Sequence, residues 1–160
     1  RDCLLSRGLG DVYKRQGILV QRRAGCDLVS YLTPRLFSHL GIKRPTWETD
    51  PLGNSFGAGG LFLTLSELHS FGLFYLNKGK WNGKQILSEK WIEESTKPAD
   101  TDYYGYLFWR GECNSFRADG KYSQISMVLP DKNTVISLVA ECRKGEELMR
   151  ALYDLVCSKL

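Results

Sequence analysis

The sequence predicts an α+β fold in which an antiparallel sheet is flanked by helices. Apolar residues recur at helical spacing in the first half of the chain and again near its end. Residues 122–140 instead show the alternation and the apolar run that are typical of strands. The hydrophobic fraction of 42% and the charged fraction of 25% are ordinary for a globular domain.

Residues 1–16 are expected to be foreign to the protein. They show no period of 2 or 3.6 residues, and Leu4 to Gln16 resembles the translated adapter sequence that contaminates metagenomic open reading frames. Without them the chain has 18 basic and 16 acidic residues, so half of the net charge of +4 disappears. We therefore divide the chain into a non-native segment, 1–16, and a domain portion, 17–160. A genuine irregular N-terminal arm is the alternative.

Helices are expected first along the domain portion. Residues 18–20 are interpreted as the last part of a helix that ends near Gly25. Asp27 is placed to cap a short helix, and Pro34 suits the first turn of another that Gly41 closes.

A longer helix is expected after an irregular loop at residues 43–60. Thr64 and Glu67 form a capping box at its start, and Gly79 supplies its end. Asn82-Gly83 is typical of a tight turn, and Ser88 can cap a further short helix.

Strands follow, and then a last helix. The aromatic residues 104–109 favour a strand, residues 122–129 alternate, and residues 134–140 have the composition of a strand that is covered on both faces. We expect the final helix to bury a stripe made of Leu148, Leu152, Leu155 and Val156.

Three catalytic-looking features are interpreted as structural. The G-x-S-x-G pattern at residues 53–57 lacks the strand before it and the helix after it that a nucleophile elbow needs. The Y-x-N pattern at residues 75–77 lies where a helix is expected to end. His69 stands beside apolar residues on the same helix and is expected to pack rather than act as a base.

An ordered series of segments carries a family resemblance that covers residues 17–160. It consists of residues 25–41, Pro51 to Leu61, the helix from Thr64 to Gly79, Trp81-Asn82-Gly83-Lys84, Ile86 to Ile92, Tyr104 to Trp109 and Gly120 to Pro130. The series resembles the C-terminal half of the serine β-lactamase-related family. That family includes class C β-lactamases, D-alanyl-D-alanine carboxypeptidases and related esterases and amide hydrolases.

The resemblance implies an incomplete β-lactamase/transpeptidase-like fold and an acyl-enzyme mechanism. In that family the serine of S-x-x-K attacks an acyl carbon, its lysine accepts the proton, and a Y-x-N tyrosine assists the leaving group. No serine of this chain has a lysine three residues later. The catalytic residues are therefore expected to be missing from this chain, and the fragment as written is expected to be inactive.

The family's third motif is expected at Ala118, Asp119, Gly120 and Lys121. The resemblance implies that Gly120 admits the substrate to the strand and that the Lys121 backbone N–H is one of two oxyanion-hole donors. Amide-hydrolase relatives carry G-x-x-G-Q here, of which Gly120 and Gln124 keep the first and last members. An ordinary strand start is the alternative.

Ala118 departs from the family's motif. The resemblance implies that a cation at this position would bind a substrate carboxylate. The neighbouring Arg117 cannot take that role without a bulge, because in a regular strand its side chain points to the opposite face. The resemblance therefore favours an uncharged ester or small amide over a β-lactam.

The expected partner is a small ester, amide or peptide substrate. We find no nucleic-acid motif, no apolar run long enough for a membrane span and no metal-ligand spacing, and the resemblance implies no cofactor. The sequence leaves the compartment and the oligomeric state open. Two alternatives to the enzyme remain, which are a non-catalytic ligand- or peptidoglycan-binding module on the same fold and a free-standing α+β interaction domain.

Overall fold

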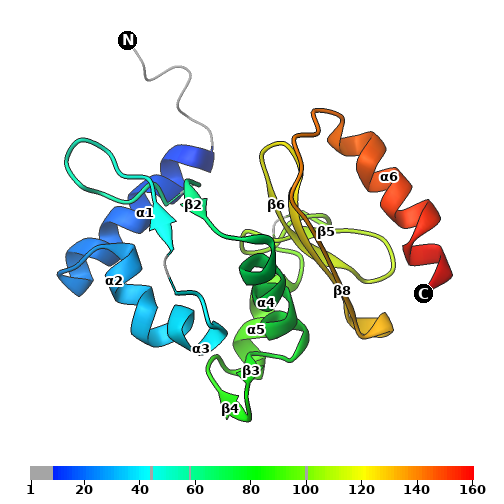
Figure 1. Ribbon diagram of the computed structural model, residues 1–160, viewed down its shortest axis with the longest axis horizontal. Coiled ribbons are helices and arrows are strands. Elements are labelled where there is room, and N and C mark those ends of the chain that lie inside the picture. The colour runs from blue at the N-terminus through cyan, green and yellow to red at the C-terminus, as the bar shows by residue number, and fades with distance from the viewer. Residues whose placement is uncertain (1–8, 44, 58, 100) are drawn as a thin grey trace. The chain divides into compact units, whose positions relative to one another are not determined.

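The computed structural model describes residues 9–43, 45–57, 59–99 and 101–160, and side chains from residue 14 onward (Figure 1). The chain divides into two compact units with a boundary between Thr64 and Leu65. Within the described residues, no helix is both long enough and apolar enough to cross a membrane.

The first unit is mostly helical. Its elements are α1 (Leu9–Ala24), α2 (Leu28–Leu32), the π-helix η2 (Thr33–Phe37), α3 (Ser38–Leu40) and the two-stranded antiparallel pair of β1 (Thr46–Trp47) and β2 (Leu61–Phe62). The predicted caps are confirmed. The Asp27 carboxylate accepts a hydrogen bond from the Ser30 backbone N–H, and Gly41 ends α3 in the left-handed conformation.

Helix α1 begins well before residues 18–20, where the sequence indicates a helix end. It starts at Leu9 and continues through Lys14, Arg15 and Gln16, which are good helix formers although residues 1–16 show no helical period. Arg22 and Arg23 in the last turn stabilise this helix, because their positive charges lie near the negative end of the helix dipole. Residues 1–8 lie outside the described part, and the foreign origin of 1–16 stays a prediction.

The second unit contains the main sheet. Its helices are α4 (Leu65–Leu76), α5 (Glu89–Thr96), α6 (Gly145–Leu155) and the short 3₁₀ turns η3 (Pro130–Lys132) and η4 (Cys157–Lys159). Strands β3 (Lys80–Trp81) and β4 (Lys84–Gln85) form a hairpin. Strands β5 (Trp109–Arg110), β6 (Phe116–Gly120), β7 (Gln124–Leu129) and β8 (Thr134–Leu138) form an antiparallel sheet in that order. The α+β prediction is confirmed.

Strand β7 is covered on both faces. Ile125, Met127 and Leu129 join Cys157 in the core, against which Met149, Leu152 and Tyr153 pack from α6. On the other face α4 approaches so closely that a Cβ at Gly72 would lie 2.4 Å from the Ser126 hydroxyl oxygen. Figure 1 shows α4 and α6 on opposite sides of the sheet.

Several sequence expectations are wrong in this unit. Residues 134–140 were predicted to form a strand covered on both faces, but β8 ends at Leu138 and is a half-buried strand at the edge of the sheet. Residues 104–108 were predicted to be strand, but only Trp109 and Arg110 pair with β6, because Leu107 adopts a left-handed conformation with φ of 71°. In the expected stripe of α6, Leu155 is 62% exposed and Val156 is 38% exposed. The helix ends at Leu155, and Cys157 takes the buried position instead.

Tyr75 occupies the centre of an aromatic cluster. Its ring lies 4.9 Å from that of Phe71 and 4.7 Å from that of Phe108, and Phe116 contacts it at 6.2 Å. Burial raises the pKa of the Tyr75 hydroxyl above its ordinary value of 10.0, and a hydrogen bond with the Ser95 side chain lowers this pKa by less. Tyr75 therefore belongs to the core, as expected for a helix residue.

Because the pKa of Tyr75 is raised in the folded protein, the free energy of unfolding is expected to fall at alkaline pH. The contribution of the neutral, buried Tyr75 to this free energy is complete below pH 10 and is lost at higher pH, because the tyrosine of the unfolded chain ionises first. At pH 7, Tyr75→Phe is expected to lower the free energy of unfolding by about 1 kcal/mol through the lost hydrogen bond. In denaturant titrations, this difference from wild type should narrow above pH 10. The half-exposed Tyr106→Phe serves as control, and a gap that stays constant with pH contradicts the burial effect.

Gly79 and Gly83 provide a matched test of the turn after α4. Both have positive φ, of 77° and 81°, but a Cβ at Gly79 would lie 2.4 Å from the Leu87 carbonyl oxygen, whereas a Cβ at Gly83 would meet nothing within 4 Å. Gly83→Ala is expected to cost about 1 kcal/mol of unfolding free energy from backbone strain alone. Gly79→Ala should cost at least about 1 kcal/mol more, because backbone must move to admit the methyl group. Equal losses in thermal denaturation would contradict the close packing.

Candidate functional site

The hairpin of β6 and β7 carries all four residues of the predicted third motif. Ala118, Asp119 and Gly120 are the last residues of β6, and Lys121 is the first residue of the turn. The register is regular, with Ala118 opposite Ser126, Asp119 opposite Ile125 and Gly120 opposite Gln124. Because the buried side of β7 fixes this register, the position of the turn is fixed as well.

The turn has two residues in the left-handed conformation. Tyr122 has φ of 62° and Ser123 has φ of 71°, and the Ser123 N–H donates to the Gly120 carbonyl over 3.1 Å. Ser123 occupies the second glycine position of the G-x-x-G-Q pattern. Only glycine adopts this left-handed conformation without steric cost, so Ser123 holds a backbone conformation that favours glycine.

The turn directs the Lys121 N–H away from the hairpin. The Gly120 carbonyl points inward to Ser123, and no described peptide bond is cis. In a trans peptide the N–H of the next residue points opposite to the carbonyl, so the Lys121 N–H points outward. Strand β5 pairs only with Phe116 and Arg117, which leaves the edge of β6 open from Ala118 onward within the described sheet.

The side chains of Arg117 and Ala118 lie on opposite faces of β6, because the two residues are neighbours in a strand of regular register. The Arg117 Nε atom lies 2.9 Å from an Asp119 carboxylate oxygen, and the Arg117 and Asp119 side chains are 16% and 25% exposed. This ion pair keeps the guanidinium on the face that α6 covers. The prediction about Arg117 is confirmed.

An open pocket of about 370 Å³ adjoins the turn. It is lined by Asp119, Gly120, Tyr122, Ser123, Cys142, Arg143 and Gly145. A second depression of about 300 Å³ lies over the α6 face and includes Arg117, Asp119 and Met149. Asp119 and Gly120 of the predicted motif are therefore accessible, whereas Ala118 and Lys121 do not line either pocket.

Residues 140–143 were missed by the sequence analysis. The Cys142 N–H donates to the Tyr122 carbonyl over 3.1 Å, and the Gln124 amide donates to the Ala140 carbonyl. Arg143 and Lys121 both lie near the ring of Tyr122, at 5.6 Å and 4.8 Å from its centre. These contacts depend on how the end of β8 folds back on the turn, and no local pattern in the sequence marks them.

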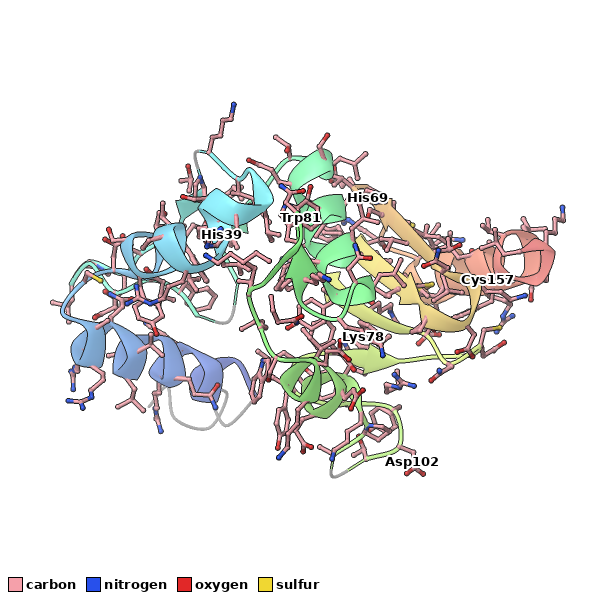
Figure 2. The ribbon with its side chains drawn as sticks, turned by 90° about the horizontal axis from the view of Figure 1, so that it is seen from below. His39, His69, Lys78, Trp81, Asp102 and Cys157 are labelled. Carbon is pink, nitrogen blue, oxygen red and sulfur yellow. The ribbon has the colours of Figure 1, made fainter. Side chains whose placement is uncertain are left out.

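The three catalytic-looking features are buried or hydrogen-bonded within the chain. Ser55 is 1% exposed, and its N–H donates to the Gln21 side chain. Tyr75 is buried in the aromatic cluster. The Nδ1 atom of His69 lies 3.1 Å from the Ser137 hydroxyl, which links α4 to β8, and Figure 2 places His69 on that helix.

Comparison with solved structures identifies the fold. A protein assigned as a 6-aminohexanoate-dimer hydrolase from Bacillus anthracis matches with a TM-score of 0.77 and 21% identity, over 88% of this chain and 40% of the other. A protein assigned as a β-lactamase from Bacteroides dorei DSM 17855 matches with a TM-score of 0.61 and 15% identity, over 81% and 49%. The fold is that of the serine β-lactamases and transpeptidases.

A third match extends the range of relatives with this fold. A penicillin-binding protein homologue from Caulobacter crescentus matches with a TM-score of 0.55 and 12% identity, over 74% of this chain and 48% of the other. No protein-family model matches the sequence, and no curated protein sequence matches it. The chain thus spans less than half the length of these three solved chains.

Gln124 is expected to hold the turn against the end of β8. Gln124→Leu removes the donor to the Ala140 carbonyl and should lower the free energy of unfolding by about 1–3 kcal/mol. Gln124→Glu should be as unstable at pH 7, but should recover part of the loss at pH 4, where the protonated acid again donates a hydrogen bond. Denaturant titrations at the two pH values measure this. The leucine variant is the control, and parallel behaviour of the two variants would contradict the assigned bond.

Proposed function

We propose that residues 17–160 supply the sheet side of an acyl-enzyme-forming serine hydrolase that acts on an uncharged ester or amide. The outward Lys121 N–H at the open edge of β6 is the observation that carries this proposal. Donors of this kind stabilise the oxyanion that forms when an acyl carbon is attacked. The fold shared with hydrolases and a penicillin-binding protein homologue supports the same assignment.

In the proposed reaction a serine oxygen forms a bond to the acyl carbon, and the serine proton passes to a neighbouring lysine. The bond to the leaving alcohol or amine then breaks, and the leaving group takes up a proton. Water hydrolyses the resulting acyl-serine and releases the acid. We propose that the serine, the lysine and a tyrosine come from a segment that this sequence does not contain, so the chain alone does not turn over substrate.

Gly120 and Ala118 have distinct roles in the proposal. Gly120 lets the substrate approach the strand edge because it has no side chain. Ala118 offers no cation to a substrate carboxylate, and the ion pair with Asp119 holds Arg117 on the other face. An uncharged substrate therefore fits this edge better than a β-lactam or a D-alanyl peptide.

A non-catalytic binding module on the same fold is the second candidate, favoured by the alanine at position 118. Recovery of the longer reading frame from the source DNA separates the two candidates. An upstream S-x-x-K followed by Y-x-N, together with covalent labelling by a fluorophosphonate, supports the hydrolase. Absence of both motifs, or absence of labelling in the folded longer protein, supports the binding module.

Two substitutions at Lys121 test the oxyanion donor in that longer protein. Lys121→Pro removes the N–H and is expected to lower the rate of fluorophosphonate labelling by about 10²–10³-fold. Lys121→Ala keeps the N–H and should label at close to the wild-type rate. Circular dichroism checks that both variants fold. Similar rates for the proline and alanine variants would show that this N–H does not stabilise the oxyanion.

A further inference from the structure

A stacked pair of aromatic side chains is exposed beside the site strand. Tyr103 is 59% exposed and Trp109 is 39% exposed. Their ring centres lie 6.2 Å apart and their planes differ by only 14°, so they form an offset stack. Aromatic rings prefer offset-stacked or edge-to-face contacts with other rings, so a partly exposed stack offers a surface that a further flat ring can contact.

The register of the sheet places this pair at the start of the open edge. Trp109 in β5 lies directly opposite Arg117 in β6, and β5 pairs no further along β6. The side chains of Trp109 and Arg117 therefore lie on the same face of the sheet. Asp119, two residues after Arg117 in β6, lies on that face as well. The pocket of about 300 Å³ on this face is lined in part by Arg117 and Asp119. Trp109 thus lies beside β6 at Arg117, four residues before Lys121 in the chain.

Two arginines near the stack are held by partners within the chain. The Arg117 guanidinium lies 5.9 Å from the centre of the Trp109 ring, and its Nε atom is bound to Asp119. The Arg110 guanidinium donates to two neutral groups, the Thr96 carbonyl and the Asn114 side chain. We take the ligand ring to be uncharged because the proposed substrate of the site is uncharged.

We propose that the Tyr103–Trp109 stack binds a flat, uncharged aromatic ring carried by the ester or amide substrate. This inference rests on the proposed function, since it names the substrate class of that site. A ligand ring extends an existing near-parallel stack, so the protein rings need no rearrangement when it binds. The acyl carbon then lies further along β6, toward Lys121.

Binding to the 160-residue chain tests the proposal without any turnover. N-(2-naphthyl)acetamide is the probe, and N-cyclohexylacetamide has the same amide but no flat ring. Isothermal titration should show that the naphthyl compound binds more tightly than the cyclohexyl compound. Trp109→Ala should weaken naphthyl binding about 10-fold, and Tyr103→Ala should weaken it by a smaller factor.

Trp91 supplies the matched control. It is 46% exposed and lies 6.0 Å from Tyr106, but its ring is tilted by 43° and it belongs to α5. Trp91→Ala should leave naphthyl binding unchanged. No naphthyl binding by the wild-type chain, or equal losses from Trp91→Ala and Trp109→Ala, would overturn the proposal. If Trp109→Ala does not fold, the comparison is made with the exposed Tyr103→Ala. A longer protein that no fluorophosphonate labels would refute the hydrolase, but would not alter these binding results.

Discussion

The pairing of β6 with β7 is the constraint on which the rest of the site depends. Strand β7 is held from one face by the core under α6, where Ile125 and Met127 are almost completely buried. From the other face α4 packs against Ser126, at a distance that only a glycine at position 72 permits. A shift of register by one residue would turn Ile125 and Met127 out of this core, so the strand has a single register. Five residue pairs transmit that register to β6.

The fixed register determines the chemistry available at the end of β6. It places the turn after Gly120, and the bond from Ser123 to the Gly120 carbonyl then turns the Lys121 N–H outward. It also places the side chains of Ala118 and Arg117 on opposite faces of β6. The open edge and the outward N–H are therefore consequences of one buried strand.

The elements with strong local signals could be predicted from the sequence. Asp27 and Ser88 cap helices because their side chains satisfy free backbone N–H groups, and Asn82-Gly83 makes the turn of the β3–β4 hairpin. Each of these signals involves residues that are close together in the chain.

Features that depend on distant contacts could not be predicted in this way. The aromatic residues 104–108 have high strand propensity, but Leu107 is left-handed and Gly105 is pressed against the Lys97 carbonyl, so they form no ladder. At the end of α6, Cys157 is buried and Leu155 is exposed, because the helix ends at Leu155 and the chain changes direction there. Cys142 and Arg143 reach the turn only through the fold of the sheet.

Amide hydrogen exchange in the 160-residue chain measures whether the Lys121 N–H is free to bind an oxyanion. We predict slow exchange of the Ser123 N–H, which is bonded to the Gly120 carbonyl, and unprotected exchange of the Lys121 N–H two residues before it. Protection of the Lys121 N–H equal to that of Ser123 would mean that this donor is already used within the chain. The strand edge would then have no oxyanion donor to offer.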